Sequence, residues 1–171
     1  MLRLLTPADS QLIQPVFDAC GDYAVAQDGR RFAANAAELA FDELPPGFSK
    51  ESKRIYAIEH PEGQIVGLVE GVRGYPISTL WFIGRMLIVP EARSTGIGTR
   101  AVAAIERYVE SMEACSEIEL AVLKINVRGL HFWTAQGFCH RRDAAAEHFG
   151  QRLHERWILG KSLRAASSQQ R

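Results

Sequence analysis

A glycine-containing turn at residues 93–98 (RSTGIG) has the clearest chemical meaning in the sequence. It separates an apolar run ending at Pro90 from an amphipathic pattern over residues 99–112, so we expect a strand, a turn and a helix start to meet there. The first turn of a helix has backbone N–H groups without intrahelical acceptors and carries partial positive charge. Gly96 and Gly98 have no Cβ, so a ligand can approach the backbone closely. The turn therefore predicts a site for a phosphate or pyrophosphate.

The elements that must position this turn can be read from the hydrophobic patterns. We expect, in order, a strand, two helices, three strands, a helix, a strand, a helix and two strands. The expected strands cover residues 2–5, 53–59, 64–73, 79–89, 117–125, 138–142 and 153–159, and the helices begin at Thr6, at Phe32 or Asn35 (ending at Leu44), after the glycine turn, and at Val127. This order predicts an α/β (α+β) domain with a mixed sheet over residues 1–163, followed by a flexible C-terminal tail at 164–171.

Composition limits the partners. The 171 residues include twenty basic and twenty acidic side chains, so no field of one sign is available to attract nucleic acid or an anionic membrane. Cys20, Cys115 and Cys139 are far apart and form no CxxC pair, which argues against disulfides or structural zinc and fits a reducing cytoplasm. Residues 1–5 lack the long apolar stretch expected of a signal peptide, and no apolar run approaches the length of a membrane helix. We expect a cytoplasmic protein without metal, membrane or nucleic-acid partners.

Two motifs carry a resemblance to a known family. Residues 88–98 resemble the acyl-CoA pyrophosphate loop of the GNAT superfamily of N-acetyltransferases, which follows an apolar strand with the pattern Arg/Gln-x-x-Gly-x-Gly/Ala. Downstream, Asn126, Gly129, Phe132-Trp133 and Gly137-Phe138 resemble the second signature, in which an Asn ends a strand and a helix closes with Gly-Phe. The resemblance extends over residues 2–163, and residues 44–47 and 71–76 resemble a bacterial subset whose substrates are mostly unassigned.

The resemblance implies a single-domain fold and a cosubstrate. The fold is a mixed, mostly antiparallel seven-stranded sheet flanked by about four helices, in which two parallel strands splay apart to admit acetyl-CoA. Backbone N–H groups of the turn would bind the pyrophosphate, and the pantetheine arm would pair with the strand before it. The residues implied to contact acetyl-CoA are Met86, Leu87, Ile88, Arg93, Ser94, Thr95, Gly96, Ile97, Gly98, Thr99, Asn126 and Trp133. Arg93 has an equal alternative, which is to cap the neighbouring strand end.

The implied activity is acetyl transfer to a primary amine of a small molecule or peptide by direct attack on the thioester, without a covalent enzyme intermediate. Two side chains depart from the family pattern. The Tyr that often serves as the acid is Trp133 here, and the Glu that serves as base in some relatives is Ala121. An indole N–H can donate a hydrogen bond but cannot deliver a proton at neutral pH. A non-catalytic acyl-CoA-binding sensor therefore stays open as an alternative.

Substitute catalytic groups are Glu70, Glu119 and Tyr75. Glu70 lies in an apolar strand, where a carboxyl facing the cleft would have a raised pKa. The structural alternative is that Glu70 forms an ion pair with Arg85. We favour this pair as the role of Arg85, because an unpaired buried charge is costly. Glu119 shares the strand face of Ala121, and Tyr75 could line the acceptor site from a loop. Aromatic residues 81, 82, 132, 133 and 138 are expected in the core, and His148 and His154 on the surface. A homodimer through the last strands or through the central sheet edge is an open alternative, and the sequence does not identify the acceptor.

Overall fold

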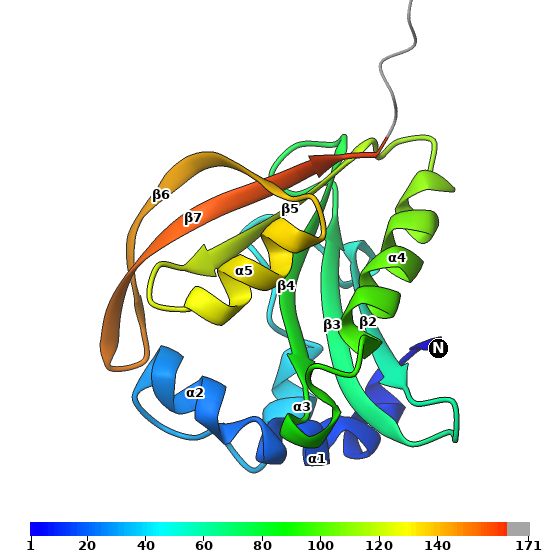
Figure 1. Cartoon of the computed structure of the whole chain (residues 1–171), viewed down its shortest axis with the longest axis vertical. Helices are drawn as coiled ribbons and strands as arrows, with labels where there is room; N and C mark the ends of the chain where they lie inside the picture. Colours follow the sequence, from blue (N-terminus) through cyan, green and yellow to red (C-terminus); the bar gives the residue numbers. More distant parts are fainter. Residues whose placement is uncertain (164–171) are drawn as a thin grey trace, which may run out of the picture.

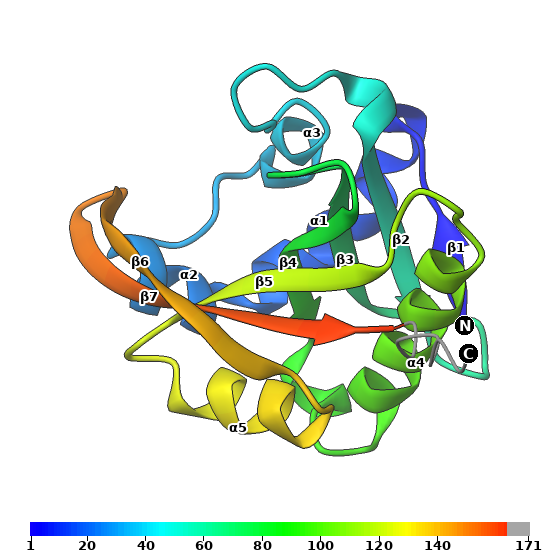
Figure 2. The same ribbon diagram turned by 90° about the horizontal axis from the view of Figure 1, so that it is seen from above.

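The computed structural model describes residues 1–163, which form one seven-stranded sheet with helices on both faces (Figures 1 and 2). The predicted tail at 164–171 lies outside the described residues. The strands are β1 (Leu2–Leu4), β2 (Lys53–Glu59), β3 (Ile65–Arg73), β4 (Leu80–Ile88), β5 (Glu117–Leu123), β6 (Cys139–Phe149) and β7 (Arg152–Ser162). The α-helices are α1 (Ser10–Ala19), α2 (Gly21–Asp28), α3 (Ala36–Ala40), α4 (Ile97–Glu110) and α5 (Val127–Ala135). Short 3₁₀ turns occur at Pro7–Asp9, Lys50–Ser52 and Pro90–Ala92.

The strand order is β1-β2-β3-β4-β5-β7-β6, and every neighbouring pair is antiparallel except β4–β5. Helices α1 and α3 cover one face of the sheet, while α4 and α5 cover the other, as the view from above shows (Figure 2). Helix α4 binds the sheet through one apolar stripe, in which Val102, Ile105 and Val109 are buried at helical spacing. The predicted fold class, a mixed and mostly antiparallel seven-stranded sheet with one parallel pair, is confirmed.

The parallel pair opens part-way along its length. Strands β4 and β5 are paired only from Leu80 opposite Glu117 to Ile83 opposite Leu120. On the other edge of β4, Glu70 pairs with Arg85 but Gly71 pairs with Ile83, so Gly84 is an extra residue at a β-bulge. A bulge bends its strand and ends regular pairing. Beyond Gly84 the two strands diverge, which leaves the β5-facing edge of β4 without a partner strand among the described residues (Figure 1).

Helix α2 was not predicted from the sequence, because its residues show little apolar periodicity. Contacts from distant segments hold it instead. The ring Nε2 of His154 hydrogen-bonds the carbonyl of Gln27 at 2.8 Å, and the Gln151 N–H donates to the carbonyl of Asp28 at 3.0 Å. His154 is therefore buried, and the prediction of a surface position for it was wrong.

Two other boundaries differ from the predicted ones. Helix α3 ends at Ala40 and not at Leu44, since the Lys53 ammonium binds the carbonyls of Ala40 and Glu43 and so fixes the chain in a non-helical path. The last two strands are longer than expected. Most of β6 is exposed on both faces, so the alternating pattern that marks a half-buried strand is missing from its sequence. In the described part of the chain, no helix has the length and apolar character needed to cross a bilayer.

Candidate functional site

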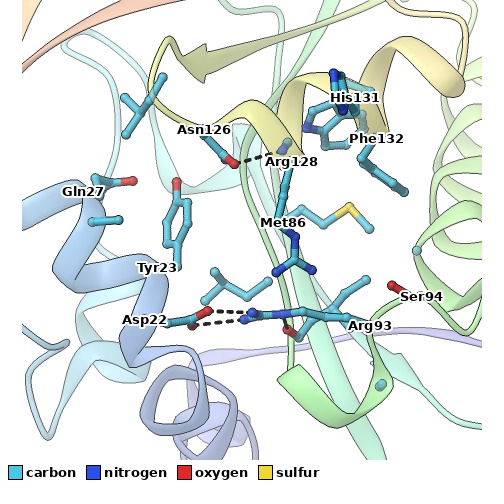
Figure 3. A pocket seen from close by; sticks show the side chains of 18 of the residues that line it. Asp22, Tyr23, Gln27, Met86, Arg93, Ser94, Asn126, Arg128, His131 and Phe132 are labelled. Atoms are coloured by element: carbon cyan, nitrogen blue, oxygen red, sulfur yellow. Dashed lines mark hydrogen bonds and ion pairs between the residues drawn. The ribbon is translucent and has the colours of Figure 1, made fainter.

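A cavity of about 610 Å³ occupies the gap between the diverging strands (Figure 3). Its walls come from α2, the end of β4, the glycine turn, the start of α4, the end of β5 and α5. The lining residues are Asp22, Tyr23, Ala26, Gln27, Met86, Leu87, Ile88, Ala92, Arg93, Ser94, Gly96, Gly98, Thr99, Leu123, Ile125, Asn126, Arg128, Gly129, His131, Phe132 and Trp133. Ten of the twelve residues that the resemblance implied for acetyl-CoA contact, including Asn126 and Trp133, line this one cavity. The other two, Thr95 and Ile97, lie beside it in the turn.

The turn has the backbone geometry of an anion-binding loop. Ser94 and Gly96 have φ values of 63° and 79°, in the left-handed region, and Gly96 precedes the first residue of α4. The first helical hydrogen bond runs from the Arg100 N–H to the Gly96 carbonyl at 3.1 Å. Within residues 1–163, the earlier N–H groups of Ile97, Gly98 and Thr99 have no acceptor, and no side chain caps the helix. These donors and the helix dipole together favour a phosphate.

Close packing explains the second glycine of the turn. A Cβ at Gly98 would lie 3.0 Å from Ile88 Cδ1 and 3.1 Å from a ring carbon of Phe132. A side chain there would push the start of α4 away from β4 and α5. Gly98 therefore allows the three elements that form this end of the cavity to come together.

Arg93 stabilises the turn through contacts within the protein. Its Nε donates to the Ile88 carbonyl at 2.9 Å, and its terminal nitrogens donate to the two carboxylate oxygens of Asp22 at 2.6 and 3.1 Å. The hydrogen bond from Arg93 holds the pKa of the Asp22 carboxyl below its ordinary value. Of the two roles that the sequence left open for Arg93, the structure shows the strand-end contact, and it adds a link to α2.

Arg128 is a second cation of the cavity, and the sequence analysis missed it. It lies in the first turn of α5, is exposed, and points into the cavity (Figure 3). Its guanidinium has no hydrogen bond or ion pair with any of the described residues. Arg128 comes two residues after Asn126, which the sequence placed at the predicted ligand site. This closeness in the sequence could have identified it.

Asn126 and Trp133 both have structural roles beside the cavity. The Asn126 side-chain oxygen accepts the Gly129 N–H at 2.9 Å and so caps α5, which leaves its amide NH₂ group for other contacts. The Trp133 ring packs edge-on against Phe132 and Phe138, with centroid distances of 5.0 and 5.1 Å. Trp133 is only 8% exposed, so this residue belongs to the core as well as to the wall.

The three substitute catalytic residues do not line the cavity. Glu70 is 4% exposed and its two oxygens bind Lys53 and Arg85, each at 3.0 Å. This is the ion-paired alternative that the sequence also allowed, and the predicted Arg85–Glu70 pair is present. Both carboxylate oxygens are engaged by cations and the residue does not line the cavity, so the geometry does not support a role as the cleft base.

Glu119 and Tyr75 also contact neighbours that do not line the cavity, Glu119 through an ion pair and Tyr75 through ring packing. The two oxygens of Glu119 accept from the two terminal nitrogens of Arg142, each at 2.9 Å. The Tyr75 ring lies between Phe48 and Phe82, at centroid distances of 5.4 and 5.2 Å. Among residues 1–163, no group of three His, Cys, Asp or Glu side chains is arranged to hold a metal ion.

The donor set of the cavity fits an elongated ligand with phosphate groups at one end. Open helix N–H groups lie at the turn, the unpaired Arg128 faces the cavity from α5, and the unpaired edge of β4 at Met86–Ile88 leads away from the turn. A strand edge offers alternating N–H and C=O groups to an extended chain that contains amides. The cavity therefore suits a ligand with a diphosphate head and an amide-containing arm.

Comparison with known proteins agrees with this geometry. The model of the acetyltransferase (GNAT) family matches residues 19–138. An acetyltransferase from Thermus thermophilus has a TM-score of 0.67 at 21% identity, over 92% of this chain and 96% of that one. Spermidine N-acetyltransferase from Vibrio cholerae, in complex with CoA and spermine, has a TM-score of 0.73 at 16% identity, over 95% of each chain. At these identities the likeness shows the fold. A comparison with curated proteins gives no match.

Proposed function

The chain belongs to the acetyltransferase (GNAT) family, and from this premise we propose that it transfers the acetyl group of acetyl-CoA to a primary amine. The observation that carries the proposal is the cavity between the diverging strands β4 and β5, which has an open helix N-terminus at one end. The cavity holds both reactants in one place, and proximity supplies much of the acceleration when an amine attacks a thioester directly.

Each part of acetyl-CoA has a proposed partner. The pyrophosphate binds the backbone N–H groups from Ser94 to Thr99, and Arg128 adds a charged contact. The pantetheine arm runs along the free edge of β4 at Met86, Leu87 and Ile88, where a backbone N–H also stabilises the developing oxyanion. The amide of Asn126 is available to the arm from the opposite wall, and Trp133 closes that wall.

The acceptor is a small-molecule or peptide amine. Its class is best found with a panel that contains spermidine and spermine, amino acids, and lysine-containing peptides. The polyamines are included because one neighbour with the same fold was solved with CoA and spermine.

A second function needs a test because of the ion pairs described above. Both carboxylates that could have acted as the base are bound by cations, Glu70 by Lys53 and Arg85, and Glu119 by Arg142. A domain that binds acyl-CoA without turning it over would also show this arrangement. Calorimetry with acetyl-CoA and an assay of free thiol release across the panel distinguish the two. Binding with turnover supports the transferase, binding without turnover supports the sensor, and no binding contradicts both.

Substitution of Gly96 tests the placement of the diphosphate. Gly96→Asp should lower acetyl-CoA affinity more than about 10-fold, because a carboxylate at the helix start opposes the pyrophosphate. Gly63→Asp is the matched control. Gly63 also has a positive φ, 90°, but lies in the β2–β3 turn, where an added Cβ would have no atom within 4 Å, so it shares the backbone strain without the site. Equal affinity of the two variants in calorimetry would refute the placement.

A further inference from the structure

Tyr23 stands in the cavity with an unused hydroxyl group. Its ring projects from α2, and its hydroxyl is directed toward the side where α5 begins and Asn126 lies (Figure 3). Among residues 1–163 this hydroxyl has no hydrogen-bond partner. The Tyr23 ring packs against the buried apolar cluster that includes Leu87 of β4, and Leu87 lines the same cavity. Tyr23 therefore lies on the side of the cavity formed by β4.

Helix α2 is fixed at both ends, which holds Tyr23 in this position. Near its start, Asp22 binds Arg93 of the glycine turn. Near its end, the Gln27 and Asp28 carbonyls bind the β6–β7 hairpin through His154 and Gln151. The helix therefore connects the two sides of the cavity, and a side chain from its middle is held across the gap. Such anchoring suits a residue that must meet a reacting atom at a defined position.

The proposed reaction leaves a thiolate that must gain a proton, and few residues of the cavity can supply it. The Trp133 indole does not release a proton at neutral pH. The hydroxyls of Ser94 and Thr99 belong to the phosphate end. His131 lines the cavity from α5, beside Phe132 and across the cavity from Tyr23 (Figure 3). Two titratable side chains remain on the side of the cavity formed by α2, Asp22 and Tyr23. Asp22 is held by Arg93, so Tyr23 is the remaining candidate for the proton donor.

We propose that Tyr23 is a catalytic residue that gives its phenolic proton to the sulfur of CoA as the thioester is cleaved. This inference rests on the proposed function. The amine nitrogen forms a bond to the acetyl carbon, the carbon–sulfur bond breaks, and its electron pair goes to sulfur. Sulfur then takes the Tyr23 proton, and the phenolate recovers a proton from the nitrogen of the new amide through water. Atoms and charge balance without a further reagent.

The environment of the phenol agrees with this role. Burial raises the pKa of Tyr23 above its ordinary value, so the group is protonated before the reaction. The Arg85 guanidinium opposes part of that rise in pKa, whereas the Asp28 and Glu70 carboxylates add to it. A proton is therefore present when the thiolate forms and can be replaced afterwards.

The test measures the thiol pKa of bound CoA, so it needs no acceptor. CoA labelled with ¹³C at the methylene next to sulfur is bound to the protein and titrated by NMR, in the wild type and in Tyr23→Phe. A hydrogen bond from Tyr23 favours the thiolate, so the thiol should be about tenfold less acidic in Tyr23→Phe, a shift of about one pKa unit. With the best amine of the panel, kcat should fall at least about 10-fold while KM for acetyl-CoA changes little.

Tyr108→Phe is the matched control, since Tyr108 lies on α4 against Trp81 and Tyr56, outside the cavity lining. Thermal unfolding of each variant verifies that it is folded. An unchanged thiol pKa or an unchanged kcat in Tyr23→Phe would overturn the inference, as would a thiol pKa that responds to His131→Gln instead. Failure of the wild type to bind CoA would contradict the proposed function itself, which is a distinct result.

Discussion

At the scale of single residues, the arginines near the cleft divide into paired and unpaired cations. Arg85 binds Glu70 and Glu43, Arg93 binds Asp22, and Arg142 binds Glu119. Arg128 alone of the cavity-lining arginines lacks such a partner among the described residues. A paired guanidinium has little left to offer a ligand, whereas an unpaired one can form charge-assisted hydrogen bonds with a phosphate.

Arg128→Ala should therefore weaken acetyl-CoA binding by about 3- to 10-fold, because the contact is exposed and screened by salt. The loss should shrink as the salt concentration rises, and calorimetry at two ionic strengths measures it. Arg107→Ala, an exposed position on α4 outside the cavity, is the control. Equal effects of the two substitutions would mean that Arg128 does not contact the ligand.

Glu70 was a candidate catalytic residue in the sequence, but in the fold it forms buried ion pairs with Lys53 and Arg85. Glu70→Gln would leave Lys53, which is 8% exposed, and Arg85 without their shared carboxylate. Removing one partner of a buried ion pair costs about 3–5 kcal/mol, so urea unfolding should show a loss of that order. Asp42→Asn breaks the exposed pair with Lys50 and should cost less than about 1 kcal/mol. A loss for Glu70→Gln as small as that of the control would contradict the buried pair.

At the scale of elements, the sequence predicted the strands and helices whose positions are determined by residues close together in the chain. The strand, glycine turn and helix α4 were predicted because the apolar run, the glycines and the 3.6-residue periodicity all lie within a short segment. Helix α2 was missed because it depends on partners such as His154 and Gln151, more than a hundred residues away. For the same reason the sequence predicted the phosphate end of the cleft but not Tyr23, which only that helix brings to the cavity.

Two glycines on adjacent central strands, Gly71 and Gly84, should respond differently to substitution by alanine. A Cβ at Gly71 of β3 would lie 2.3 Å from the ring of Trp81, which is 1% exposed and cannot move easily. Gly71→Ala should therefore destabilise the fold by about 1–3 kcal/mol through overpacking. Gly84 of β4, at the bulge, has no atom within 4 Å of an added Cβ, so Gly84→Ala should change the free energy of unfolding by less than about 0.5 kcal/mol. Chemical denaturation measures both, and similar values would show that Trp81 does not pack against Gly71 as described.

At the scale of the whole molecule, the sheet consists of two parts that meet at a short parallel pairing. Strands β1–β4 form one part and β5–β7 the other, and only four residue pairs of β4 and β5 join them. Helix α2 adds a second connection, because it contacts the turn after β4 through Asp22 and the β6–β7 hairpin through Gln27. The cavity lies between these two connections, so its shape depends on both.

The Asp22–Arg93 connection should make stability depend on acid. The hydrogen bond from Arg93 lowers the pKa of Asp22 in the folded state, so its contribution to stability is present above the unfolded pKa of about 4 and is lost as the pH falls through the folded value. Asp22→Asn should therefore be less stable than the wild type at neutral pH, and the difference in unfolding free energy should shrink as the pH falls below about 4, the unfolded value. Urea unfolding of both proteins at a series of pH values measures the difference. A difference that stays constant down to the lowest pH would show that the carboxylate of Asp22 does not stabilise the connection, and that α2 is held by the hairpin alone.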